Sequence, residues 1–279
     1  MPFYVSPEQA MKDKADYARK GIARGRSGVV IQYDAGILFV APNPSGALHK
    51  ISEIYDRIAF AAVGRYNEFE NLRKAGVRYA DMTGFQYDRQ DVTARGLANW
   101  YAQILGSIFT DSNKPFEVEI VVAEVGSSPE DDQIYRITFD GSVAEEHGFV
   151  AMGGQSDQVA GVLKQHYADS MPLADALAAA IEGMSGPQNG ERPEISAGQL
   201  EVAVLDRGRA HRKFRRLAGA RLEALLAEAR QSPPAASGGA DSGGAGANGK
   251  SGGNGTGGSG PDGGAPPASG PGGPAGGPA

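Results

Sequence analysis

The side chains that could do acid–base, nucleophilic or metal chemistry are scattered in this chain of 279 residues. The chain contains no cysteine, which excludes thiolate zinc sites, cysteine nucleophiles and disulfide bonds. The spacing between its histidines matches no metal-binding motif, so we interpret them as structural or surface residues: His49, His147, His166 and His211. His166 lies beside the apolar face of a predicted helix, where we expect it to be partly packed. We expect no metal site and no cofactor.

Other polar motifs have simpler interpretations than catalysis. The sequence GQSDQ at 154–158 resembles a nucleophile elbow but lacks its final glycine, and Ser156 is expected to cap the helix that follows. The acidic pairs at 131–132 and 145–146 lie in predicted loops, where solvent gives no reason for shifted pKa values. The basic run at 212–216 could contact nucleic acid, but a solvated helix start or a patch facing another subunit is simpler. No motif identifies an enzyme site by itself.

The composition changes sharply near residue 231. The last 49 residues contain 19 glycines, 8 prolines and no aromatic or β-branched aliphatic residue, so we predict a disordered tail over 232–279. The remainder has 26 basic and 31 acidic residues, and this mildly acidic balance argues against a nucleic-acid binder. No apolar run approaches the roughly 20 residues needed to cross a membrane. The N-terminus does not look like a signal peptide. We therefore expect a cytoplasmic protein that does not enter the membrane.

The sequence predicts a series of helices and strands, and these elements must position the polar residues described above. Ser6, Pro7 and Glu8 are typical of a helix start, with a capping side chain, a proline and an acid in the first turn. Apolar spacing predicts helices over 7–20, 65–78, 93–111, 156–168, 172–184 and 214–230. Alternating or continuous apolar runs predict strands over 28–33, 37–41, 48–54, 57–63, 116–122, 134–139, 149–152 and 200–206.

The order of these elements favours an α+β fold. Helices come in pairs between groups of strands, whereas a doubly wound parallel sheet would alternate them singly. Two antiparallel sheets packed face to face, with helix pairs outside, bury the apolar faces better. We therefore predict a four-layer αββα sandwich over 27–231, preceded by an N-terminal segment, helix and linker over 1–26.

Several short segments in this order resemble the proteasome α subunits of the actinobacterial type. They are FYVSP at 3–7, DYARKG at 16–21, LHKISEI at 48–54, AFAAVG at 59–64 and MGG at 152–154. The resemblance covers 3–230. It implies the same αββα sandwich, known as the N-terminal-nucleophile hydrolase fold, and a helix before the first strand that processed catalytic β subunits lack.

The resemblance also implies that this chain is not an enzyme by itself. In the family, proteolysis belongs to β subunits, whose mature N-terminal threonine starts the first strand. Here Arg26 stands at the nucleophile position, and Pro42 replaces the aspartate that follows the second strand. We therefore expect no catalytic residue in this chain. The alternative is a self-processing N-terminal-nucleophile hydrolase or a β-type protease subunit, with Ser27 as the candidate nucleophile.

The partners implied by the family are identical α subunits in a seven-membered ring, proteasome β subunits and an AAA ATPase that delivers proteins tagged with a ubiquitin-like modifier. The family's ATPase-docking lysine matches Lys50, and its small linker residue matches Gly25. Without the family, a lysine at a strand edge would face solvent or discourage edge pairing. The Tyr-Asp-Arg gate element of archaeal and eukaryotic relatives is missing. We expect an apolar gate built from the residues before Ser6: Pro2, Phe3, Tyr4 and Val5.

Overall fold

Two five-stranded antiparallel sheets form the centre of the fold in the computed structural model, which describes residues 6–185 and 195–231. The first sheet has the order β10 (Phe214–Leu217), β9 (Leu200–Asp206), β2 (Gly36–Pro42), β1 (Gly28–Tyr33) and β8 (Phe149–Met152). The second sheet has the order β3 (Ile51–Tyr55), β4 (Ile58–Gly64), β5 (Val118–Glu124), β6 (Gln133–Ile137) and β7 (Val143–Glu146).

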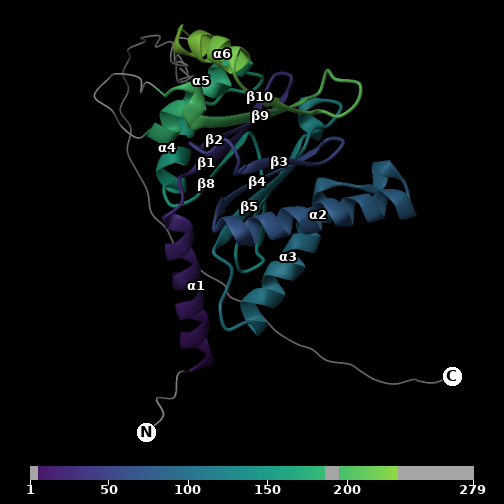
Figure 1. Ribbon diagram of the computed structural model, residues 1–279, viewed down its shortest axis with the longest axis vertical. Helices are drawn as coiled ribbons and strands as arrows, with labels where there is room; N and C mark the ends of the chain where they lie inside the picture. Colours follow the sequence, from purple (N-terminus) through teal and green to yellow (C-terminus); the bar gives the residue numbers. More distant parts are fainter. Residues whose placement is uncertain (1–5, 186–194, 232–279) are drawn as a thin grey trace, which may run out of the picture. The chain divides into compact units, whose positions relative to one another are not determined.

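Helices cover the outer face of each sheet (Figure 1). The first sheet packs against α4 (Ser156–His166) and α5 (Leu173–Ser185), with α6 (Ala220–Gln231) against α5. The second sheet packs against α2 (Tyr66–Gln86) and α3 (Ala94–Asp111), while α1 (Pro7–Ala23) contacts β4 and β5. Short 3-10 turns occur at Arg89–Asp91, Pro129–Asp131 and Ala197–Gln199. The predicted four-layer αββα sandwich is confirmed.

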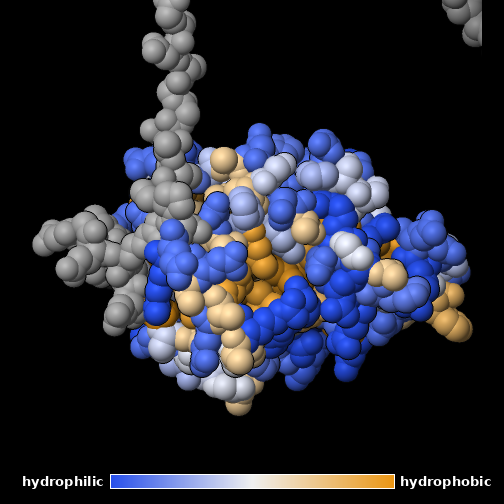
Figure 2. All heavy atoms as spheres, turned by 90° about the horizontal axis from the view of Figure 1, so that it is seen from above, coloured by the Kyte–Doolittle hydropathy of each residue, from blue (hydrophilic) through white to orange (hydrophobic). Residues whose placement is uncertain are grey.

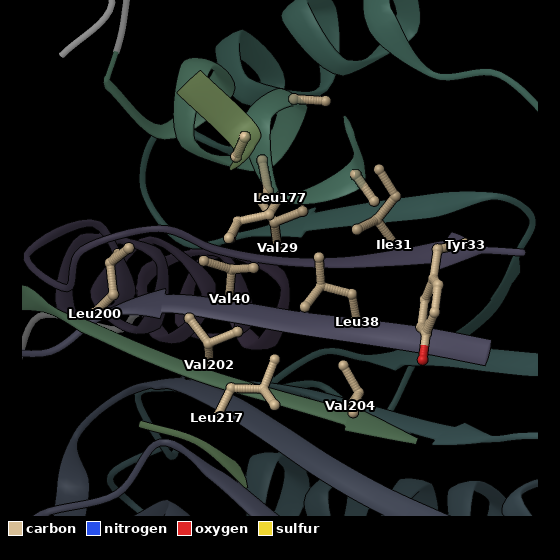
Figure 3. Packing of buried hydrophobic residues seen from close by; sticks show 14 of the residues in the cluster. Val29, Ile31, Tyr33, Leu38, Val40, Leu177, Leu200, Val202, Val204 and Leu217 are labelled. Carbon is tan, nitrogen blue, oxygen red and sulfur yellow. The ribbon is translucent and has the colours of Figure 1, made fainter. Parts of the chain in front are cut away.

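The central strands are apolar because both of their faces are buried. In β1, Val29 and Ile31 point outward to the core that includes Leu177 of α5, as Figure 3 shows. Val30 points the other way, into the core between the two sheets. A third core lies between the second sheet and the helix pair α2–α3, with Tyr101 among its fully buried side chains. Each central strand therefore contributes side chains to two of the cores.

The predicted final helix over 214–230 is wrong at its start. Residues 214–217 form β10, an edge strand paired with β9, and the helix begins only at Ala220 after Gly219 at φ +56°. Phe214 packs toward the core between the sheets, whereas Leu217 packs into the outer core. This alternation of faces is that of a strand. Pairing with the edge of β9 thus overrides the local helical pattern.

Other boundaries and loops also differ from the predictions. Helix α2 extends to Gln86, and β7 adds an edge strand, so the acidic pair at 145–146 lies in a strand and not in a loop. That strand is largely exposed and ends in two glutamates, so it lacks the run of apolar residues from which the other strands are predicted. The third strand begins at Ile51, one residue after Lys50. The predicted helix start at Ser6 is confirmed, because its hydroxyl accepts a hydrogen bond from the backbone N–H of Gln9.

Two interpretations of single polar residues also change. Ser156 is the first residue of α4 and not its cap: Gln155 occupies the capping position without a side-chain hydrogen bond, after a turn at Gly153 with φ +101°. Asp132 is buried and pairs with Arg207 at 2.7 Å, so this member of the acidic pair at 131–132 is not solvated. Its charge is balanced by an internal partner.

The prediction for His166 is confirmed. It is largely packed, and its Nε2 lies 3.5 Å from Glu182.

The face of the molecule seen from above gathers apolar residues in a hollow with hydrophilic side chains around it (Figure 2).

Candidate docking site at the start of the first strand

The start of β1 is where catalytic relatives of this fold are expected to carry their nucleophile. Here α1 leads into β1 through a short connection that contains Arg26 and Ser27. Ser27 is only 7% exposed, and its hydroxyl accepts a hydrogen bond from the backbone N–H of Gln155 at 3.3 Å. A guanidinium is a permanent cation and cannot act as a nucleophile. The geometry therefore provides no activated nucleophile at this position.

Two glycines hold this connection against the turn before α4. A Cβ at Gly154 would lie 2.6 Å from the Cα of Ala23, and a Cβ at Gly153 would lie 3.0 Å from the Cα of Ser27. Gly153 also has φ +101°, a conformation that favours glycine. The segment between α1 and β1 is thus fixed by backbone packing, because neither glycine position has room for a side chain.

A pocket of about 610 Å³ opens beside this connection. Its walls include Gly25 and Arg26 from the connection, Pro42 from the end of β2, and Met184 and Ser185 from the end of α5. A Cβ at Gly25 would lie 3.2 Å from the carbonyl oxygen of Ile22 and 3.4 Å from the backbone nitrogen of Gly64, so this glycine packs closely against the backbone. Arg26 brings a positive charge and forms no ion pair with any residue in 6–185 or 195–231. The positive charge of Arg26 favours a ligand with a negative group in this pocket.

Lys50, from the other sheet, does not itself line this pocket but contacts Pro42, which does. It is half-buried just before β3, and its ammonium donates a hydrogen bond to the carbonyl oxygen of Pro42 at 3.1 Å. Burial lowers the pKa of the Lys50 ammonium, the nearby Glu201 carboxylate opposes that shift, and Arg26 adds to it. Lys50 is thus bonded to Pro42, which lines the same pocket as Gly25, and Arg26 is a second cation beside this pocket.

Glu201 is a functional candidate that the sequence reasoning missed. This carboxylate on β9 is only 5% exposed and accepts backbone hydrogen bonds from Lys50 at 2.8 Å and from Ile51 at 3.2 Å. It also accepts from Asn43 Nδ2 at 2.8 Å and pairs with the guanidinium of Arg216. The sequence signal that could have found it is an acid next to the apolar run of residues 202–205, because a buried charge persists only with partners.

The expected gate and tail lie outside the described residues, namely Pro2, Phe3, Tyr4 and Val5 at one end and 232–279 at the other. Within 6–185 and 195–231, no group of three or more histidine, aspartate or glutamate residues could hold a metal ion. In the same ranges, no helix combines the length and the apolar character that a membrane span requires.

The fold and the comparisons agree on the class of protein. Residues 23–205 match the proteasome subunit family. A proteasome subunit alpha from Streptosporangium roseum is 72% identical over 229 residues, covering 82% of this chain and 87% of the relative. The protein of the same name from Thermobifida fusca is 67% identical over 229 residues, covering 82% and 92%. The one from Thermomonospora curvata is 68% identical over 228 residues, covering 82% and 98%.

The chain belongs to the proteasome subunit family and, within it, to the α subunits of the actinobacterial type. The resemblance found in the sequence is therefore confirmed.

Proposed function

We propose that this chain is a non-catalytic subunit of the α ring of a proteasome core particle, whose threonine-type catalysis belongs to the β subunits. One observation carries the proposal. The position of the nucleophile lies inside the chain, behind α1, where Arg26 precedes a buried Ser27 whose hydroxyl is already bonded to the backbone of Gln155. A nucleophile activated by its own α-amino group needs a free N-terminus at this point.

The α-ring role includes three tasks in this proposal. Seven identical copies form a ring, the ring templates the assembly of β subunits, and the residues before Ser6 gate the entrance for protein substrates. An exposed apolar end of α2 supports assembly with neighbouring subunits, because Phe85 is 92% exposed and lies near the exposed Met82 and Tyr87. Large exposed apolar groups of this kind mark protein–protein contacts. We place the particle in the cytoplasm.

The pocket beside β1 is proposed to dock the proteasomal AAA ATPase. The C-terminal peptide of the ATPase would enter the pocket, with its terminal carboxylate at the Lys50 ammonium. An ammonium has three donors, and Lys50 uses one of them on Pro42, so donors remain for a ligand. Arg26 adds positive charge to the lining of the pocket, which also includes Gly25, the match to the small linker residue of the family. In this way the chain serves the degradation of proteins tagged with a ubiquitin-like modifier.

The experiment that tests the non-catalytic role is an intact-mass measurement on the chain co-expressed with its cognate β subunit. A mature chain that retains residues 1–26 is expected, because no nucleophile needs to be released. Loss of residues 1–26, which would leave Ser27 at the N-terminus, would favour a self-processing hydrolase or a β-type protease subunit instead.

A further inference from the structure

The segment that carries Lys50 is held by one buried carboxylate from the opposite sheet. Glu201 lies on β9 of the first sheet, on the face shared with Ala203 and Leu205, which point into the core between the sheets. Lys50 directly precedes β3 of the second sheet. The carboxylate of Glu201 therefore links one sheet to the other at the backbone of the docking lysine, Lys50.

Both oxygens of this carboxylate are occupied by the Lys50 segment. Oε2 accepts the backbone N–H of Lys50 and the side-chain amide of Asn43, each at 2.8 Å. Oε1 accepts the backbone N–H of Ile51 at 3.2 Å and pairs with Arg216, whose guanidinium also donates to the carbonyl oxygen of Ile51 at 2.7 Å. Two consecutive backbone N–H groups are thus fixed by one side chain, which sets the direction in which the Lys50 side chain leaves the backbone.

The same carboxylate also acts on the charge of Lys50. Burial and Arg26 lower the pKa of the ammonium, and Glu201 is the carboxylate that opposes them. The other charged or titratable groups around Glu201 are Arg216 from β10 and His49, whose Nδ1 lies 3.3 Å from Oε1. Glu201 therefore influences both the placement and the protonation of one lysine.

We propose that Glu201 is the positioning residue of the docking site: it fixes the backbone at Lys50 and Ile51, so that the Lys50 ammonium is directed to a free C-terminal carboxylate. This inference rests on the proposed role of Lys50. A merely structural role for Glu201, as a link between β9 and β3, predicts a different pattern of effects. That role would affect stability and assembly, but it would leave the protonation of Lys50 unchanged.

The chain offers a matched control in Glu124 on β5. Its side chain is 9% exposed, accepts the backbone N–H of Ala94 at 2.6 Å and pairs with Arg57 at 2.6 Å. Glu124 is thus a second buried carboxylate with one backbone donor and one arginine, but its partners are not those of the pocket. Glu124→Gln reproduces the loss of a buried charge without touching the Lys50 segment.

The test uses the particle assembled from this chain and its cognate β subunit. The probe is a fluorescent synthetic peptide with the C-terminal residues of the cognate ATPase, with either a free carboxylate or a C-terminal amide. Affinity is measured from neutral to alkaline pH for the wild type, Glu201→Gln, Glu124→Gln and Lys50→Ala. Binding of the free carboxylate is expected to decline as Lys50 loses its proton.

We expect Glu201→Gln to bind the free-carboxylate peptide roughly tenfold more weakly, as a lost charge-assisted contact would predict. The alkaline decline should also begin at lower pH, because the charge that favours protonated Lys50 is gone. The amidated peptide should bind weakly and equally to wild type and Glu201→Gln. Glu124→Gln should match the wild type throughout.

Two results would overturn the inference. One is unchanged affinity and an unchanged alkaline decline in Glu201→Gln. The other is an equal loss for both peptides with no movement of the decline, which would leave Glu201 only a structural link. If Glu201→Gln fails to assemble because Arg216 is left unpaired, the double variant Glu201→Gln with Arg216→Gln removes both charges and must meet the same criteria. Unchanged binding in Lys50→Ala would instead refute the docking role itself.

Discussion

Replacing Lys50 with alanine removes the ammonium that lies 3.1 Å from the carbonyl oxygen of Pro42 at the pocket wall. A hydrogen bond to a charged group contributes about 1.5–3 kcal/mol. Its loss corresponds to a roughly tenfold to hundredfold weaker affinity for a peptide carboxylate. Because Lys50 is half-buried, solvent and salt screen this contact less than a surface ion pair. Burial also lowers the pKa of Lys50, so wild-type binding should decline below the pH range where an exposed lysine loses its proton.

The assay is ATPase-stimulated protein degradation by the assembled particle, normalised to the peptide hydrolysis of the same particle, together with direct binding of the ATPase. Lys164→Ala, at an exposed position on α4, is the matched control and should behave as wild type. Equal ATPase affinity in Lys50→Ala and Lys164→Ala would refute the assignment of Lys50 to the docking site.

Three further predictions follow from the gate, the tail and the second cation. Deleting residues 2–6 should raise hydrolysis of small peptides by the assembled particle, because the apolar segment no longer obstructs the entrance; an unchanged rate would argue against a gate there. Removing residues 232–279 should leave ring assembly intact by size-exclusion chromatography, whereas loss of assembly would show that the domain boundary is misplaced. Arg26→Gln should weaken peptide binding several-fold at low salt compared with Arg24→Gln, because Arg26 lines the pocket and Arg24 does not; equal affinities would exclude Arg26.

The layers of the fold could be predicted because local signals and burial agree there. Ser6 caps α1 as its sequence context indicates, and the apolar runs of β1 and β2 match strands buried on both faces. The start of the last helix could not be predicted in the same way. Residues 214–217 carry a mixed apolar and basic pattern, and only the free edge of β9 makes them a strand. Pairing with a strand that is distant in the sequence determines the secondary structure of such a segment, and the local sequence carries no information about that pairing.

The candidate site also contains residues that can be identified from the sequence and one that cannot. The resemblance identifies Lys50 and Gly25; Lys50 donates a hydrogen bond to Pro42, and Pro42 and Gly25 line one pocket. Glu201 could not be connected to them from sequence, because it lies 151 residues from Lys50 along the chain. Its charge next to the apolar run of residues 202–205 indicates that partners exist, but the packing of the two sheets determines which donors they are. Buried polar networks of this kind depend on the tertiary fold.

The central claim is that this chain assembles an α ring and does not itself cleave peptides. The most direct measurement is peptide hydrolysis by the purified chain alone and after reconstitution with its cognate β subunit. The account predicts no turnover by the chain alone, and activity sensitive to a threonine-protease inhibitor once the β subunit is present. Robust turnover by the isolated chain that resists this inhibitor would contradict it.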